Sequence, residues 1–185
     1  VDPGYATPED FHGTIIRGNT IINVGNTAIG VASCPDCVIE NNVVIQEQTD
    51  FSTIGISAPD RTRSEDDAPD DNLTIRNNTF MFNNGDAGGT GIKVAKEGSS
   101  HTVVNNVIAY LGNGSRFSAF RTTDLTPVNF EAFDNNIVYY PNASGANWET
   151  SYELLADWQS ATGFDTHSQI ADPMFTSIVS PDYNL

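Results

Sequence analysis

Short apolar segments recur along the chain, and each is interrupted near its centre by an asparagine. The five segments are IIRGNTII on Asn19, VIENNVVI on Asn42, TIRNNTFMF on Asn78, VVNNVIAY on Asn106 and AFDNNIVYY on Asn136. The residues three before and two after the asparagine are apolar in all five. Alternate residues of a strand face the same side of a sheet, so the pattern predicts two interior columns of stacked side chains.

A second set of segments lies between the asparagine segments in strict alternation. Its members are AIGVAS around Gly30, TIGISA around Gly55, TGIKVA around Gly91 and FSAFRT around Ser118. Two interleaved motifs at a base period of about 23 residues, with loops added, predict a solenoid. We therefore expect a right-handed parallel β-helix, an all-β fold of about five rungs over residues 14–140.

The asparagines are expected to form a column of stacked amides that bond to one another and to the backbone of the bend. Asparagine also tolerates the left-handed backbone conformation that a sharp bend requires. Two positions before the asparagine stand Arg17, Glu40, Arg76, Val104 and Asp134. These positions predict an outward column whose first three members alternate in charge.

Two segments lie outside the repeat, one at each end of the chain. Residues 1–13 are expected to form an N-terminal loop, and residues 141–185 a short helix and an extended tail, all in a single domain. Thr150 with Glu153 matches a capping box at the helix start, and Gly163 is typical of the residue after a helix end. The helix is expected to pack against the side of the solenoid or to cover its end. We interpret the sequence as part of a longer chain.

Composition and charge restrict the function. The 185 residues include 24 acidic against 8 basic side chains, for a formal net charge of −16. This balance argues against a nucleic-acid partner, which requires clustered cations, and suits a secreted or cell-surface protein. The sequence contains no apolar run of about 18 residues, so we expect no membrane insertion.

Two cysteines, Cys34 and Cys37, lie in a Cys-Pro-Asp-Cys turn. A structural zinc site would require a second pair of ligands, which the sequence lacks. The pattern therefore predicts either a local disulfide or two buried thiols.

The asparagine-centred rungs, with Gly-Ile strands such as Gly55-Ile56 and Gly91-Ile92 between them, resemble the pectate-lyase-like superfamily of right-handed β-helices over residues 14–140. In polysaccharide lyases of this superfamily, a lysine or arginine on an exposed strand removes the proton beside a uronate carboxylate, and calcium neutralises that carboxylate. The resemblance makes Lys93 and Arg121 the candidate catalytic residues. Lys93 points outward if Ile92 and Val94 point inward.

A long acidic insertion between Ser57 and Asn72 supplies further candidates. Its Arg61 and Arg63, together with Phe120 on a rung strand, are predicted to contact a polysaccharide substrate. The candidate calcium ligands are Asp86, Glu97, Asp66 and Asp67. The alternative is that the insertion is a solvated acidic loop without a ligand.

The Asp-rich signatures of pectin-type hydrolases and the Asp-Pro-His-Glu signature of alginate epimerases are absent from the rung strands. The sequence leaves the question of enzyme activity open and favours a secreted polysaccharide-active module, with uronate lyase chemistry as its leading form. The alternative is a non-catalytic β-helix that binds glycan or assembles at a surface, with end-to-end association through the open ends of the helix.

Overall fold

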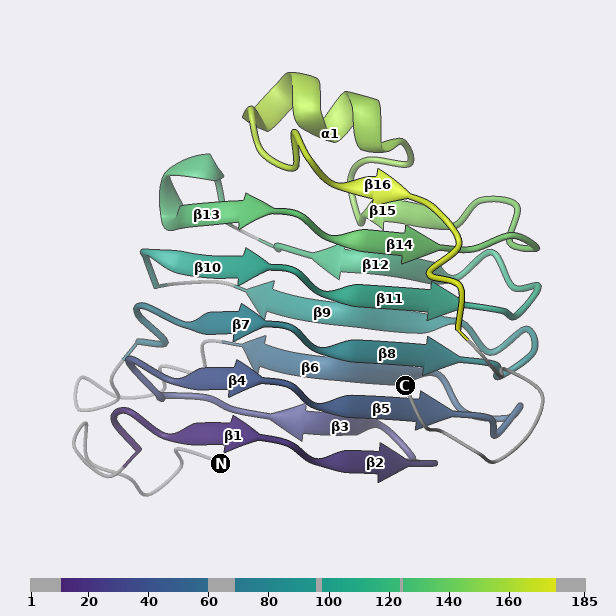
Figure 1. Cartoon of the computed structure of the whole chain (residues 1–185), viewed down its shortest axis with the longest axis horizontal. Coiled ribbons are helices and arrows are strands. Elements are labelled where there is room, and N and C mark those ends of the chain that lie inside the picture. Colours follow the sequence, from purple (N-terminus) through teal and green to yellow (C-terminus); the bar gives the residue numbers. More distant parts are fainter. Residues whose placement is uncertain (1–10, 60–68, 96–97, 124, 176–185) are drawn as a thin grey trace.

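The computed structural model describes residues 11–59, 69–95, 98–123 and 125–175, and its strands form three parallel sheets (Figure 1). The first sheet contains β1 (Ile15–Arg17), β4 (Val38–Glu40), β7 (Thr74–Arg76), β10 (His101–Val104) and β13 (Phe130–Asp134). The second contains β2 (Thr20–Ile22), β5 (Val43–Gln46), β8 (Thr79–Phe82), β11 (Val107–Tyr110), β14 (Ile137–Tyr139) and β16 (Gln169–Ile170). The third contains β3 (Thr27–Gly30), β6 (Thr53–Pro59), β9 (Gly89–Ala95), β12 (Phe117–Arg121) and β15 (Asn147–Glu149).

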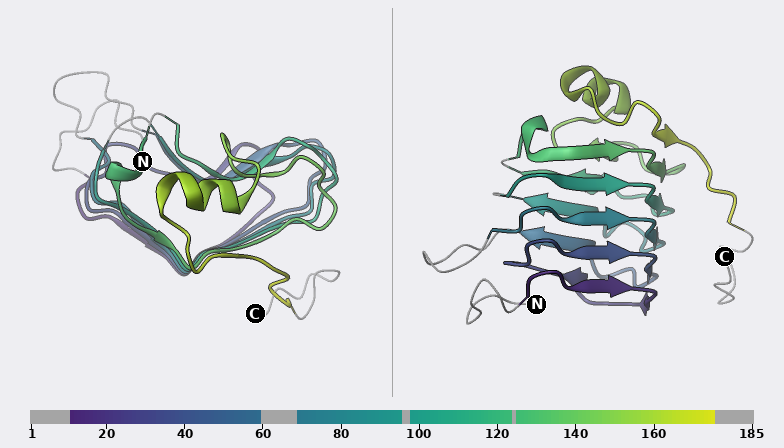
Figure 2. Two further views of the ribbon diagram at one scale, coloured as in Figure 1. Left: turned by 90° about the horizontal axis from the view of Figure 1, so that it is seen from above. Right: turned by 60° about the vertical axis from the view of Figure 1, so that its left-hand side comes forward.

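Each rung contributes one strand to each sheet, so successive rungs stack in register, as the view along the solenoid shows (Figure 2). Both predicted interior columns are confirmed. The column three before the asparagine pairs Ile16, Ile39, Ile75, Val103 and Phe133 across the first sheet. The column two after it pairs Ile21, Val44, Phe80, Ile108 and Val138 across the second sheet. From the second rung onward every member is at most 1% exposed, so these columns form the core.

The asparagine ladder is also confirmed. The Nδ2 of each asparagine donates to the Oδ1 of the next, at 2.9 Å from Asn19 to Asn42, 3.0 Å to Asn78, 3.1 Å to Asn106 and 3.2 Å to Asn136. The same Oδ1 atoms accept the backbone N–H of the preceding asparagine at 3.0–3.1 Å. The ladder thus satisfies backbone groups that the bend would leave unpaired in the core.

The left-handed residue of the bend is not the ladder asparagine, and that detail of the prediction is wrong. Positive φ angles occur one position earlier, at Gly18, Asn41, Asn77, Asn105 and Asn135. The ladder asparagine itself must aim its amide inward along the stack, while its neighbour makes the turn. Glycine and asparagine are the residues that adopt this conformation most easily.

The central residues of the second repeat set do not all align with one another in the third sheet. In the third sheet Gly30 pairs with Ser57, and Ser118 with Thr90, so neither aligns with Gly55 or Gly91. Gly55 and Gly91 lie where the backbone packs tightly against its neighbours. A Cβ on Gly91 would meet Ala119 O at 2.6 Å and the Ile108 side chain at 2.8 Å.

The outward charge column is confirmed for one pair. Arg76 bonds Glu40 with both Nε and Nη2 at 2.8 Å. At the last rung Asp134 pairs with His167 Nδ1 at 2.6 Å. Hydrogen bonds from His167 and Asn135 lower the pKa of Asp134 and outweigh its slight burial. Such exposed pairs contribute about 1 kcal/mol or less each.

Cys34 and Cys37 form a disulfide, which resolves the two alternatives left by the sequence. Both residues are fully buried at the start of the second rung. The disulfide therefore links two buried residues of the turn that leads into β4.

The helix α1 (Leu155–Thr162) and a short 3-10 turn, η1 (Pro127–Asn129), lie at the C-terminal end of the solenoid (Figure 1). The helix covers the end of the stack, and Gly163 ends it in a left-handed conformation, as predicted. The predicted capping box is wrong, because the helix begins after Leu154 without a side-chain cap. Thr150 instead follows β15, and Glu149 forms a β-bridge with Tyr152. The fifth rung thus extends past residue 140 to β15.

A buried carboxylate terminates the asparagine ladder beneath the helix. Asp165 Oδ1 accepts Asn136 Nδ2 at 3.2 Å and the Ser168 hydroxyl. Its Oδ2 accepts the indole N–H of Trp148 at 3.1 Å and of Trp158 at 2.8 Å. Burial raises the pKa of Asp165 to about 6, although all four hydrogen bonds act in the opposite direction.

Candidate functional site

Strand register brings the two predicted catalytic residues together. Lys93 near the end of β9 pairs with Arg121 at the end of β12, one rung apart in the third sheet. Neighbouring strands lie about 4.8 Å apart, so the two side chains project from adjacent positions of one column. Arg121 is exposed and Lys93 is half-buried.

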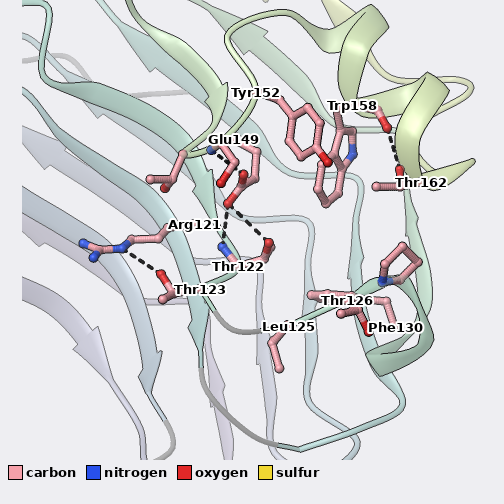
Figure 3. Close-up of a pocket in the computed structure, with 13 residues that line it drawn as sticks. Arg121, Thr122, Thr123, Leu125, Thr126, Phe130, Glu149, Tyr152, Trp158 and Thr162 are labelled. Carbon is pink, nitrogen blue, oxygen red and sulfur yellow. Dashed lines mark hydrogen bonds between the residues drawn. The ribbon is translucent and has the colours of Figure 1, made fainter.

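Arg121 is oriented by its own strand end. Its Nε donates to Thr123 Oγ1 at 3.1 Å, and its terminal nitrogens bond no other described residue. Figure 3 shows Arg121 and Thr123 on one side of the chain and Thr122 and Glu149 on the other. Arg121 and Thr123 therefore face outward from the end of β12, whereas Thr122 faces the interior, where it meets Glu149.

Behind that strand end lies a cleft of about 490 Å³ (Figure 3). It lies between the end of β12, η1, the turn after β15 and α1. Threonine and serine side chains share its lining with an apolar part made of Leu125, Pro127, Phe130, Tyr152 and Trp158. Arg121 stands at its edge.

Glu149 is the buried charge of this cleft, with 3% of its surface exposed. Its Oε1 accepts the Thr122 backbone N–H at 2.9 Å and the Thr122 hydroxyl at 3.2 Å. Its Oε2 accepts the Ser151 N–H at 2.7 Å. The last residue of β15 therefore joins the last two rungs and presents a carboxylate to the cleft wall.

Phe120 is not a surface residue, and its predicted role in substrate binding is wrong. It is 1% exposed and packs against Phe133 at 4.9 Å and Trp148 at 5.4 Å between ring centroids. Ala119 beside it is also fully buried. Ala119 and Phe120 are consecutive buried residues, so strict alternation fails at this point of β12.

Of the four predicted calcium ligands, Asp86 is the one that lies among the described residues, so their assembly stays a prediction. Asp86 is exposed in the turn before β9, whereas Lys93 lies near the other end of that strand. Asp66, Asp67 and Glu97 lie outside the described residues, as do Arg61 and Arg63. No group of three potential metal ligands occurs among residues that are described.

The cleft and Glu149 were missed by the sequence analysis. The stretch from Thr150 to Glu153 was interpreted as a helix start, which hid the turn that places Ser151 and Tyr152 at the cleft. The one sequence feature that pointed to this site was an acidic residue, Glu149, directly after a large apolar residue, Trp148.

The comparison with family models gives one match. Residues 9–154 match the model of the right-handed beta helix region. The chain belongs to the right-handed β-helix family. Its match extends over all five rungs and ends just before α1. Searches of the curated proteins and of the solved structures found no match.

No helix within the described ranges is long and apolar enough to cross a membrane.

Proposed function

We propose that this β-helix is a polysaccharide-active module of a secreted or cell-surface protein, and that an acidic polysaccharide binds along the outer face of the third sheet over Lys93 and Arg121. The observation that carries the proposal is the register of these two cations on consecutive rungs. They are two of only eight basic residues in a chain of net charge −16.

Electrostatics supports this location. An acidic surface repels an anionic polymer everywhere except where cations cluster locally. A guanidinium binds a carboxylate through two parallel hydrogen bonds, and Arg121 has its terminal nitrogens available within the described structure. The rung spacing of about 4.8 Å is close to the length of a sugar residue, so both cations can contact one short stretch of polymer.

Uronate lyase chemistry is the specific form that we favour. Lys93, in its neutral amine form, would take the C5 proton. The C4–O glycosidic bond would then break as the C4–C5 double bond forms, and the resulting Lys93 ammonium would return the proton to the departing oxygen. Arg121 would neutralise the uronate carboxylate and so acidify the C5 proton. This assignment uses only residues that the strand register places side by side.

A non-catalytic glycan-binding or assembly module is the second candidate, and the first rung favours it. Among the described residues, β1, β2 and β3 each pair on one side only. Ile15 and Ile22 on these strands are 57% and 44% exposed. Open edges with exposed apolar residues promote pairing with another chain, here by end-to-end stacking.

The ultraviolet absorbance of unsaturated uronate distinguishes the candidates. The protein is incubated with alginate, pectate and glycosaminoglycans, with and without calcium. The lyase is supported if product is lost in Lys93→Ala and Arg121→Gln. Product should be retained in Arg116→Gln, which changes an exposed arginine outside the column. Binding without product favours the non-catalytic module, and neither binding nor product with any polymer refutes the proposal.

Calcium is proposed as a cofactor held with the acidic insertion. A ligand that binds only the native state stabilises it by about 2.7 kcal/mol at a concentration of 100 Kd. Calcium should therefore raise the melting temperature beyond the effect of NaCl at matched ionic strength. An equal rise of the melting temperature in both salts would favour the alternative that the insertion is a solvated acidic loop without a ligand.

A further inference from the structure

The cleft at the C-terminal end of the solenoid contains polar groups that the uronate proposal does not use. The Glu149 carboxylate accepts three hydrogen bonds within the described structure, whereas a carboxylate offers about four acceptor positions. One acceptor position therefore remains on a residue that is only 3% exposed. Both carboxylate oxygens already have partners, and the remaining position can accept from a ligand donor without displacing any of them.

Two hydroxyl groups stand next to this carboxylate. The side chains of Ser151 and Tyr152 make no hydrogen bond to any described residue, and both line the cleft. The Tyr152 ring is half-buried and packs edge-on against Trp158, with ring centroids 5.5 Å apart. Leu125 and Phe130 add apolar surface to the same cleft.

We propose that this cleft binds one neutral pyranose residue of a glycan. A pyranose has neighbouring hydroxyl groups that can donate to Glu149 and accept from Ser151 and Tyr152, and apolar C–H faces that pack on aromatic rings. The cleft volume of about 490 Å³ lies within the usual range for small-ligand pockets, about 300 to 1,000 Å³. The inference goes beyond the uronate site and stands whether or not Lys93 and Arg121 bind a polymer.

The buried carboxylate also determines which sugars the cleft rejects. A uronate placed against Glu149 would bring two negative charges together in a partly desolvated site, which disfavours the acidic sugar. The two faces of the β12 strand end therefore select opposite ligands, with uronate outside at Arg121 and a neutral sugar inside at Glu149.

A surface substitution that blocks the cleft tests the proposal. The probes are the methyl glycosides of glucose, galactose, mannose and rhamnose and their disaccharides, followed by saturation-transfer NMR. Ser151→Trp places a large side chain at the exposed mouth and keeps the backbone N–H that Glu149 accepts. Ser115→Trp, also at an exposed position, is the matched control.

At least one neutral probe should bind the unmodified protein and the Ser115→Trp control equally. Binding to Ser151→Trp should be weaker by at least about tenfold. Glucuronic acid should not compete for the cleft. Equal binding by both tryptophan variants, or no binding of any neutral probe to the unmodified protein, would overturn the proposal.

A subtler variant tests the chemistry of the site. Tyr152→Phe removes one hydroxyl and keeps the ring, so it should weaken the same probe by about fivefold, the effect of one hydrogen bond. Tyr139→Phe on β14 is the control. Unchanged affinity in Tyr152→Phe together with full loss in Ser151→Trp would overturn the role of the Tyr152 hydroxyl.

Discussion

Removal of the Asp165 carboxylate should detach the C-terminal cap from the solenoid. In Asp165→Ala the indole N–H groups of Trp148 and Trp158 lose their acceptor. The Asn136 amide loses one of its two acceptors and keeps the Val103 carbonyl, while the Ser168 hydroxyl can rotate to another partner. Each buried donor left unsatisfied costs about 1–3 kcal/mol, and the release of a desolvated charge offsets part of the sum. We expect a loss of about 3 kcal/mol in the free energy of unfolding at neutral pH.

Intrinsic fluorescence in urea measures this loss directly. The chain contains only two tryptophans, and both bond the same oxygen of Asp165, so their emission reports on this cluster. Asp157→Ala removes an exposed carboxylate from the same helix and is the control, expected to change stability by about 0.5 kcal/mol or less. Equal unfolding curves for the two variants would refute the role of Asp165 as the cap of the ladder.

The effect should also depend on pH. The folded pKa of Asp165 is raised from 3.8 to about 6, so between these values the native state binds more protons than the unfolded state. Protonation then favours folding, and the contribution of this group falls as pH rises through about 6. Relative to Asp165→Ala, the protein should lose about 2 kcal/mol of stability between about pH 4.5 and 7. A difference that grows with pH would contradict this sign.

Two further substitutions have matched controls within the chain. Asn78→Ala should lower the free energy of unfolding by about 3 kcal/mol, because it breaks the ladder on both sides. Asn19→Ala, at the exposed first rung, should cost about 1 kcal/mol or less. Equal losses of the two variants in thermal melts would show that the buried part of the ladder adds no stability. Gly91→Ala should lower the free energy of unfolding by about 1–3 kcal/mol through overpacking. In Gly30→Ala the new methyl group meets only one atom, at 3.6 Å, so stability should not change. Chemical denaturation of both variants measures these effects, and an unchanged stability of Gly91→Ala would refute the tight packing.

The solenoid was predictable because one constraint repeats five times. Asn78 must accept and donate the hydrogen bonds that the backbone of the bend requires, and the apolar residues around it must face the core. These positions therefore show the same residue types in each rung. The same repeat put Lys93 and Arg121 on equivalent strands of consecutive rungs. The inward direction of Phe120 was not predicted, because Ala119 and Phe120 are both buried and the alternation fails there.

The C-terminal cap was only partly predictable because it occurs once. Gly163 has a local conformational cause and was assigned correctly. Thr150 and Glu153 have the spacing of a helix cap, but tertiary pairing of Glu149 with Tyr152 overrides that local preference. Asp165 was not predicted, since only Ser168 bonds it locally and its other three donors, Asn136, Trp148 and Trp158, lie 29, 17 and 7 residues away.

The affinity for a fluorescently labelled oligouronate, measured by anisotropy at low and physiological salt, tests the central claim most directly. If the polymer binds over Lys93 and Arg121, Arg121→Gln should weaken binding at least about tenfold, or about 1.4 kcal/mol, and added salt should weaken binding to the unmodified protein. Arg116→Gln removes the same charge outside the column and should leave the affinity within about twofold. Equal affinities of Arg121→Gln and Arg116→Gln, or no measurable binding of the oligouronate, would contradict the account.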